Sequence, residues 1–329
     1  MEQGSGPLDA AVLRLVPFNL LLAVLALVGV AVVGAAYVMR TATIVRRERE
    51  VAARLKVGPD GVVAGASPFT LPGDPRRAVL LLHGFGDTPQ TLEYLANHLN
   101  TAGWTVRAPL LPGHGRLLRE LVKGRAGAWI GCAREELAAL RAAHEHVTLV
   151  GLSMGGAIAA IIAADTPSPP AIVLLAPYLS MPRRIRIAAA TYRIWAPLVP
   201  YVSGRGEASV RDERERKRSL SPGVTTGRLL RELHKITLRA QDALPRIVSP
   251  TLVIHSREDN RIPAEVAERN FERLGAPVRK LVWREKTGHV ITVDFGREEV
   301  FTLVDEWLSA HTPAQGAAAR VPHDRSLSH

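Results

Sequence analysis

The segment around Ser153 has the residue types and the setting of a serine nucleophile. The sequence Gly151-Leu-Ser-Met-Gly155 follows an apolar run that reads as a buried strand and precedes a run of small residues that reads as a helix. A strand, a sharp turn and a helix would present the turn serine at the edge of a sheet, and so tight a turn needs glycine at both flanking positions. We therefore expect Ser153 to attack a carbonyl carbon.

A serine hydroxyl needs a neighbouring base to accept its proton and an acid to orient that base. Where the serine lies on a strand-turn-helix, the acid and then the base follow it along the chain. His289 is the expected base, because it lies between the last apparent strand and the final helix. Asp259 follows the preceding strand and is the expected acid, with the adjacent Glu258 as the alternative.

Two backbone N–H groups should stabilise the oxyanion that forms when the serine attacks. One belongs to Met154, the residue after the nucleophile. The other belongs to Phe85, in the glycine-flanked sequence that follows the first strong apolar run. An ordinary β-turn is the alternative interpretation of His83-Gly84, but the preceding apolar run and the presence of Ser153 favour an oxyanion loop.

Several other chemistries lack the residues that they need. Cys132 is the only cysteine, so the chain can form neither an intramolecular disulfide nor a cysteine-ligated zinc site. His144 and His146 have no companion ligands, so no metal site is expected. No glycine-rich nucleotide-binding motif follows a strand. The net charge of +11 comes without a nucleic-acid recognition motif, so we expect no nucleic-acid partner and favour attraction to anionic lipid.

The elements that would position these residues alternate between strands and helices. Short apolar runs predict buried strands at residues 78–82, 104–108, 147–150, 172–175, 251–255 and 279–283. Helical periodicity separates these runs, and later helices are expected at residues 264–274 and 298–309. This alternation predicts an α/β fold with a mostly parallel sheet, in one domain at residues 61–311.

An inserted segment at residues 178–247 interrupts the alternation. It has no clear strand, two apparent helices at residues 187–194 and 227–238, and a dense run of charge at residues 211–218. We interpret it as a helical cap. Four of its apolar or aromatic side chains are expected either to line a substrate pocket or to form the core of the cap: Ile187, Trp195, Leu198 and Tyr201.

Residues 18–39 form an apolar run without a charged side chain, long enough to cross a bilayer core of about 30 Å. This predicts a transmembrane helix between an N-terminal segment at residues 1–17 and a basic linker at residues 40–60. A cleaved signal peptide is the alternative, but it would need a basic start and a shorter apolar core. The tail at residues 312–329 has no periodicity and is expected to be disordered.

The cations near this helix lie almost entirely on its C-terminal side. By the positive-inside rule, we expect a single-pass membrane protein with its catalytic domain in the cytoplasm. A solvated amphipathic helix is the alternative interpretation of the same arginines.

Five motifs occur in a familiar order: LLLHGFGDTP, APLLPGHG, GLSMGG, PTLVIHSREDNRIP and KTGHVITVD. Together, over residues 78–311, they resemble the bacterial monoacylglycerol lipases and thermostable carboxylesterases of the α/β-hydrolase superfamily. The resemblance implies the α/β-hydrolase fold, a Ser153, Asp259 and His289 triad, oxyanion donors at Phe85 and Met154, and no cofactor. The N-terminal helix has no counterpart in that group. The cap is longer and more basic than in that group, and because the cap shapes the acyl pocket, the resemblance says least about the substrate.

We therefore expect a serine carboxylic-ester hydrolase, an esterase or lipase that works through an acyl-enzyme. Its substrates would be small-molecule or lipid esters, such as monoacylglycerols and esters of short or medium acyl chains. An acyltransferase or a thioesterase would use the same triad, and a catalytically silent, membrane-tethered binding protein is a further alternative.

Overall fold

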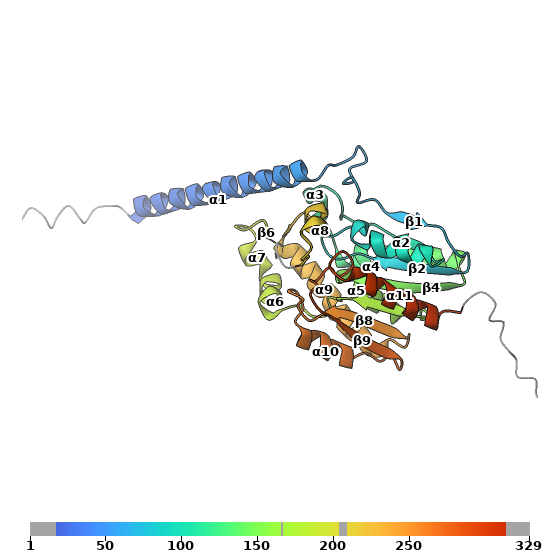
Figure 1. Cartoon of the computed structure of the whole chain (residues 1–329). Coiled ribbons are helices and arrows are strands. Elements are labelled where there is room, and N and C mark those ends of the chain that lie inside the picture. Colours follow the sequence, from blue (N-terminus) through green and yellow to red (C-terminus); the bar gives the residue numbers. More distant parts are fainter. Residues whose placement is uncertain (1–17, 166, 204–208, 314–329) are drawn as a thin grey trace, which may run out of the picture.

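The centre of the molecule is a seven-stranded sheet (Figure 1). The computed structural model describes residues 18–165, 167–203 and 209–313. In spatial order the strands are β1 (Phe69–Leu71), β3 (Thr105–Ala108), β2 (Arg77–Leu82), β4 (His146–Leu152), β5 (Ile172–Leu175), β8 (Thr251–Ser256) and β9 (Arg279–Arg284). All neighbours are parallel except β1, which pairs antiparallel with β3. The six predicted strands are confirmed, and β1 adds an edge strand.

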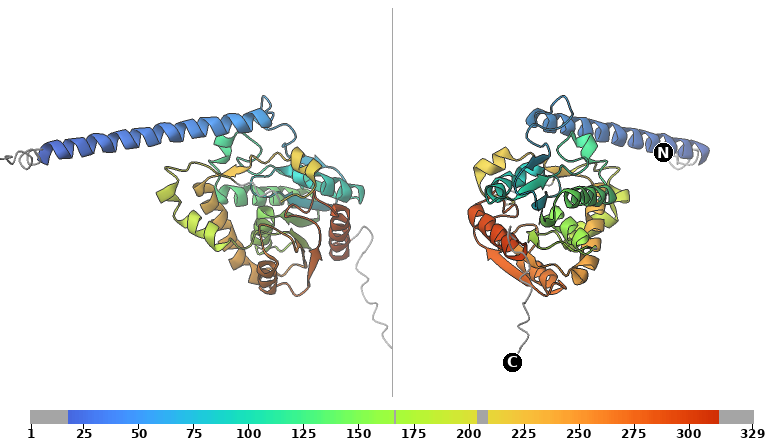
Figure 2. Two further views of the ribbon diagram at one scale, coloured as in Figure 1. Left: turned by 60° about the vertical axis from the view of Figure 1, so that its left-hand side comes forward. Right: turned by 90° about the vertical axis from the view of Figure 1, so that its right-hand side faces the viewer.

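Helices cover both faces of this sheet (Figure 2). They include α2 (Glu93–Thr101), α4 (Ala126–Ala143), α5 (Met154–Ala163), α10 (Ala264–Glu272) and α11 (Arg297–His311), with shorter turns at η2 (Pro89–Leu92), α3 (Leu118–Leu121) and η3 (Leu244–Arg246). Leu80 of β2 joins the core that α4 and α5 share, whereas its neighbour Leu81 joins the core of α2 and α11. Because successive side chains are buried on opposite faces, the central strands are continuous apolar runs.

The cap contains short strands as well as helices. Its elements are α6 (Arg183–Ala190), α7 (Tyr192–Trp195), β6 (Val202–Ser203), α8 (Glu213–Arg218), β7 (Val224–Thr225) and α9 (Gly227–Ala243). The cap contains helices, as predicted, and in addition a pair of two-residue antiparallel strands, β6 and β7, that were not clear from the sequence. The helix predicted at residues 187–194 is divided into α6 and α7 at Thr191.

The charge run of the cap forms α8. Asp212 caps this helix, because its carboxylate accepts a hydrogen bond of 2.8 Å from the backbone N–H of Arg214. Two acidic residues follow in the first turn and three basic residues in the last, the order that the helix dipole favours. The Asp212 cap and the local charge order therefore both favour a helix in this segment.

The N-terminal apolar run belongs to one long helix, α1 (Phe18–Arg54), which extends beyond the catalytic body (Figures 1 and 2). The helix continues through most of the segment predicted as a linker. Among the described residues, α1 is the helix long and apolar enough to cross a membrane, a criterion that a signal sequence near an N-terminus also meets. Its far part is exposed, with Leu27 at 70%, whereas Val51 and Leu55 at its near end are buried. Residues 1–17 and 314–329, including most of the tail predicted to be disordered, lie outside the described residues.

Candidate active site

Ser153 lies at the sharp turn between β4 and α5, with backbone angles φ 54° and ψ −115°. A positive φ is strained for a residue that is not glycine, so the surrounding structure must hold this turn. A Cβ on Gly155 would lie 2.0 Å from the Leu82 carbonyl oxygen, and one on Gly151 would lie 2.3 Å from the Gly155 carbonyl oxygen. Both positions therefore require glycine, as the sequence predicts.

Two hydrogen bonds join the three predicted residues in a line. His289 Nε2 lies 2.8 Å from Ser153 Oγ, and His289 Nδ1 lies 2.7 Å from Asp259 Oδ2. All three residues are buried. Asp259 follows β8 and His289 lies between β9 and α11, so the ends of three parallel strands bring together residues that are far apart in sequence.

The carboxylate of Asp259 is held on both oxygens. Oδ1 accepts hydrogen bonds of 2.7 Å and 3.0 Å from the backbone N–H groups of Arg261 and Ile262, while Oδ2 faces His289. Burial raises the pKa of Asp259, but His289, the nearby His255 and the N–H of Arg261 together outweigh burial and leave the pKa below its usual range. The carboxylate is therefore ionised at neutral pH.

Glu258, the alternative acid, is turned away from His289. Its Oε1 accepts a hydrogen bond of 3.0 Å from the backbone N–H of Lys286, and its other oxygen forms an ion pair with Arg211. The geometry therefore favours Asp259 over Glu258 as the partner of His289.

The backbone donors expected to form the oxyanion hole are next in sequence to residues of the site, Met154 after Ser153 and Phe85 after Gly84. In the described part of the chain, neither the N–H of Phe85 nor that of Met154 has a hydrogen-bond partner. A Cβ on Gly84 would lie 3.4 Å from Ser153 Cβ, which places the loop of residues 84–87 against the serine. A role of these two N–H groups as oxyanion donors stays a prediction.

His83 fixes the start of this loop. Its Nε2 accepts a 3.1 Å hydrogen bond from the backbone N–H of Leu111, and its Nδ1 therefore carries the proton that it donates to Gly84 O at 2.9 Å. Burial and the adjacent His114 lower the pKa of His83 to about 3, so the ring is neutral. It serves as a hydrogen-bonded link between two loops.

Two residues near the site carry no motif that would have identified them. Tyr178 donates its backbone N–H to Ser153 O at 2.9 Å. Asp87 lies close to the serine, because the same Cβ position on Gly84 is 2.9 Å from Asp87 Oδ2. Burial raises the pKa of Asp87 to about 6, against the opposing effects of His289 and Arg261.

The four cap residues expected to line a pocket occupy different settings. Ile187 and Leu198 are exposed, with 52% and 68% of their surface accessible. The indole N–H of Trp195 donates to Ala188 O at 2.9 Å, and Tyr201 packs against the edge of the core. A role in substrate binding stays a prediction for all four. Within the described residues there is no cluster of three or more side chains suited to a metal ion.

Comparison with known proteins places residues 73–295 within a family model described as serine aminopeptidase, S33. The chain is 29% identical over 248 residues to a carboxylesterase of Bacillus subtilis (strain 168), covering 75% of this chain and 97% of that protein. It is 28% identical over 251 residues to a thermostable monoacylglycerol lipase of Bacillus sp. (strain H-257), covering 76% and 97%.

Solved structures share the fold. One of two metagenome-derived lipolytic enzymes, LipS and LipT, matches with a TM-score of 0.70 and 28% identity, over 78% of this chain and 100% of its own chain. A monoacylglycerol lipase of Paleococcus ferrophilus matches with a TM-score of 0.64 and 24% identity, over 74% and 98%. The sheet and its flanking helices are therefore those of the α/β-hydrolase fold, as the sequence predicts.

Proposed function

Because the chain belongs to the serine hydrolase family described as serine aminopeptidase, S33, and its relatives are named as esterases and lipases, we propose which esters it cleaves and how. The substrates are carboxylic esters of short or medium acyl chains, including monoacylglycerols. The single observation that carries the mechanism is the hydrogen-bonded line from Asp259 through His289 to Ser153.

The reaction begins when Ser153 Oγ attacks the ester carbonyl carbon and His289 Nε2 accepts its proton. The C–O bond to the alcohol then breaks, and His289 gives the proton to the departing alcohol oxygen. Water attacks the acyl-enzyme in the second half of the reaction, again with His289 as the base. Release of the carboxylic acid restores the serine hydroxyl.

Charge stabilisation comes from two directions. The N–H groups of Phe85 and Met154 donate to the carbonyl oxygen as it becomes an oxyanion, where fixed donors act most strongly. Asp259 holds the imidazole of His289 in the tautomer with the proton on Nδ1 and stabilises the imidazolium that forms, without accepting the proton itself. The lowered pKa of Asp259 suits this role, because the carboxylate must stay charged.

We also propose that α1 is an uncleaved, single-pass membrane anchor with the catalytic domain on the cytoplasmic side. Three observations support this: the length and apolar composition of α1, the cations at its C-terminal end, and the burial of Val51 and Leu55 against the body at that same end. The mass of the protein isolated from membranes shows whether α1 has been cleaved off, and we expect the mass of the uncleaved chain. A C-terminal reporter tests orientation, and a signal from outside the cytoplasm would contradict the assignment.

A fluorophosphonate probe, which reacts with activated serines, tests the catalytic proposal. We expect the wild-type chain to be labelled and the Ser153→Ala variant to remain unlabelled. Ser168→Ala, which changes an exposed loop serine, is the matched control and should label like the wild type. A wild-type chain that is not labelled would show that the hydrolase mechanism is wrong.

Substrate class requires a second measurement on the same three proteins. Rates on p-nitrophenyl esters of increasing chain length, on monoacylglycerol, on an acyl thioester and on an aminoacyl anilide should be highest for the oxygen esters. Competing alcohols in the assay separate hydrolysis from acyl transfer. A preference for the thioester or the anilide would contradict the proposed substrate class.

A further inference from the structure

Arg54, in the last turn of α1, reaches across to the cap. Its guanidinium donates one hydrogen bond of 3.3 Å to Ser219 O and a second to Ser221 O. These carbonyls belong to residues 219–223, the stretch between α8 and β7 that we call the cap strap. The hydrogen bonds thus join two segments that are more than 160 residues apart in sequence.

The cap strap lies on the loop that carries Phe85. A Cβ on Gly86 would lie 3.7 Å from Ser221 Oγ, so this serine packs over the backbone next to Phe85. Gly86 has φ +73°, a left-handed conformation that favours glycine, and glycine has no side chain to fill the space on this side of the loop. The cap strap therefore supplies the cover that the loop itself lacks.

Both ends of the cap strap are attached to the body. Before it, the buried Glu215 of α8 accepts hydrogen bonds from Tyr94 and Arg297, which lie outside the cap. After it, Thr226 caps α9, a long helix whose apolar face is buried in the core. Arg54 holds the middle of the cap strap, between these two attachments.

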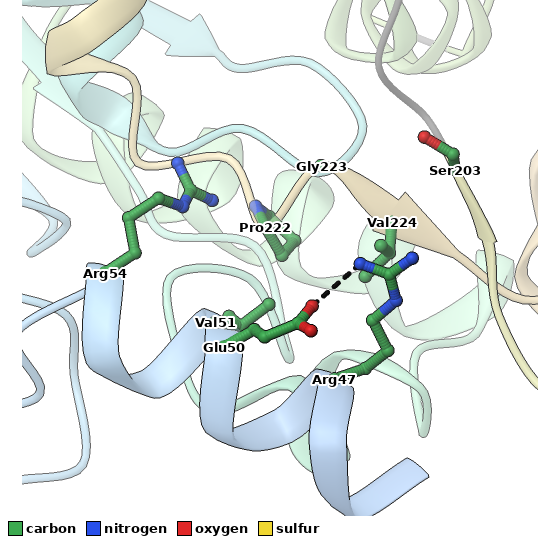
Figure 3. Close-up of a pocket in the computed structure, with 8 residues that line it drawn as sticks. All are labelled: Arg47, Glu50, Val51, Arg54, Ser203, Pro222, Gly223 and Val224. Carbon is green, nitrogen blue, oxygen red and sulfur yellow. Dashed lines mark hydrogen bonds and ion pairs between the residues drawn. The ribbon is translucent and has the colours of Figure 1, made fainter. Parts of the chain in front are cut away.

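Side-chain packing leaves space between α1 and the cap strap. A cavity of about 170 Å³ lies here, with Arg47 and Glu50 on one side and Pro222 and Gly223 on the other (Figure 3). Figure 3 shows Arg54 beside this cavity, extending from α1 toward the chain that leads into Pro222. Its hydrogen bonds therefore connect α1 to the cap strap beside a gap that apolar packing does not fill.

We propose that Arg54 is a positioning residue for the esterase reaction, which makes α1 part of the catalytic body as well as an anchor. Arg54 acts through the cap strap, which packs against the loop of residues 84–87 and so fixes the position of the Phe85 N–H. This inference rests on the proposed function. Because an oxyanion donor acts more strongly on the transition state than on the bound ester, loosening the loop should lower kcat more than it changes KM.

Kinetics of three full-length variants in detergent, on a soluble short-chain ester, provide the first test. Arg54→Ala should lower kcat roughly tenfold with little change in KM, less than the hundredfold that a misplacement of about 1 Å at a reacting group can cause. Arg54→Lys keeps a donor for the same carbonyls and should recover part of the loss. Arg47→Ala is the matched control: Arg47 lines the same cavity but forms its ion pair with Glu50 of the same helix, so kcat should not change.

Hydrogen–deuterium exchange provides a second test that does not depend on activity. In Arg54→Ala, backbone amides of residues 84–88 and 219–223 should exchange faster, while those of α4 stay at the wild-type rate. Unchanged exchange in both segments, or an unchanged kcat, would overturn the inference. If Arg54→Ala does not fold, the comparison of Arg54→Lys with wild type decides in the same way. A wild-type chain that fails to label with fluorophosphonate would instead refute the proposed function, leaving the exchange result to stand alone.

Discussion

Ser153 combines two features that a structural serine does not need. Its backbone is strained, with φ 54°, and its hydroxyl is hydrogen-bonded to the imidazole of His289, which is hydrogen-bonded in turn to the Asp259 carboxylate. Strain of this kind persists only where surrounding contacts enforce it, and here the contacts are backbone groups packed against two glycines. The arrangement keeps the serine hydroxyl within hydrogen-bond reach of the imidazole that would accept its proton.

Asp259→Asn should lower kcat about 10⁴-fold, because an amide can neither hold the imidazole in the required tautomer nor stabilise its charge. KM should change little. Steady-state kinetics on a soluble ester measure both constants. Glu258→Gln is the control for the neighbouring carboxylate and should retain the wild-type rate. A larger loss of kcat in Glu258→Gln than in Asp259→Asn would show that Glu258, and not Asp259, orients His289.

His114 should make the fold sensitive to acid. Its ring is buried between His83 and Trp129, and burial lowers its pKa to about 4 from an ordinary value of 6.5. Below about pH 6.5 the unfolded chain binds a proton on His114, whereas the folded chain binds it only below about pH 4. Stability is therefore lost as the pH falls through this window.

His114→Phe removes this titrating group and should flatten the pH dependence. Between pH 8 and pH 5, the free energy of unfolding should fall by about 2 kcal/mol less in the variant than in the wild type. Urea unfolding in a mild detergent at the two pH values measures the difference. Equal losses in the two proteins would show that His114 is not a buried neutral ring.

At the scale of elements, the site depends on close contact between β2, β4 and α5. Parallel strands end at one edge of the sheet, so Ser153 after β4, Asp259 after β8 and His289 after β9 all emerge on the same side. The N-terminus of α5 can approach β2 only because Gly155 has no side chain. Backbone packing therefore fixes where the serine stands.

Gly155→Ala should destabilise the fold by about 3 kcal/mol or more, because the added methyl would overlap the Leu82 carbonyl and force the strand and helix apart. Fluorophosphonate labelling should be lost with it. Gly131→Ala is the control: nothing lies within 4 Å of its added methyl in α4, so it should stabilise by about 0.5–1 kcal/mol. Thermal unfolding of the two variants measures both effects. A Gly155→Ala variant as stable as wild type would contradict the geometry of the turn.

At the scale of the whole molecule, α1 has two parts with different surroundings. Its apolar part extends beyond the body, on the side where α6 and α7 of the cap also lie (Figures 1 and 2). Its last turns pack on the body through Val51 and Leu55, and Arg54 adds the contact with the cap strap. One helix thus joins the proposed membrane segment to the proposed catalytic domain.

A chain shortened to residues 40–329 separates these two roles. It keeps Val51, Arg54 and Leu55, so we expect kcat on a soluble ester within about twofold of the full chain, consistent with independent sites. Loss of the apolar run should move the protein from the membrane fraction to the soluble fraction. A shortened chain that stays in the membrane fraction would contradict the assignment of residues 18–39 as the anchor.

The sequence alone was enough to predict the central strands and the residues that meet at their ends. Strands buried on both faces leave continuous apolar runs, and a nucleophile turn needs glycines at fixed spacing around Ser153, so both are local patterns. The order of acid and base after the serine pointed to Asp259 and His289 in the same way.

Tertiary structure decided what depends on contacts between distant segments. Only the fold shows that Glu258 turns toward Lys286 and Arg211, that β6 pairs with β7, and that Arg54 holds the cap strap. Asp87 and Tyr178 came to the site in the same way, with no motif to mark them. These features arise from packing across more than twenty residues of chain, and packing leaves no periodic trace in the sequence.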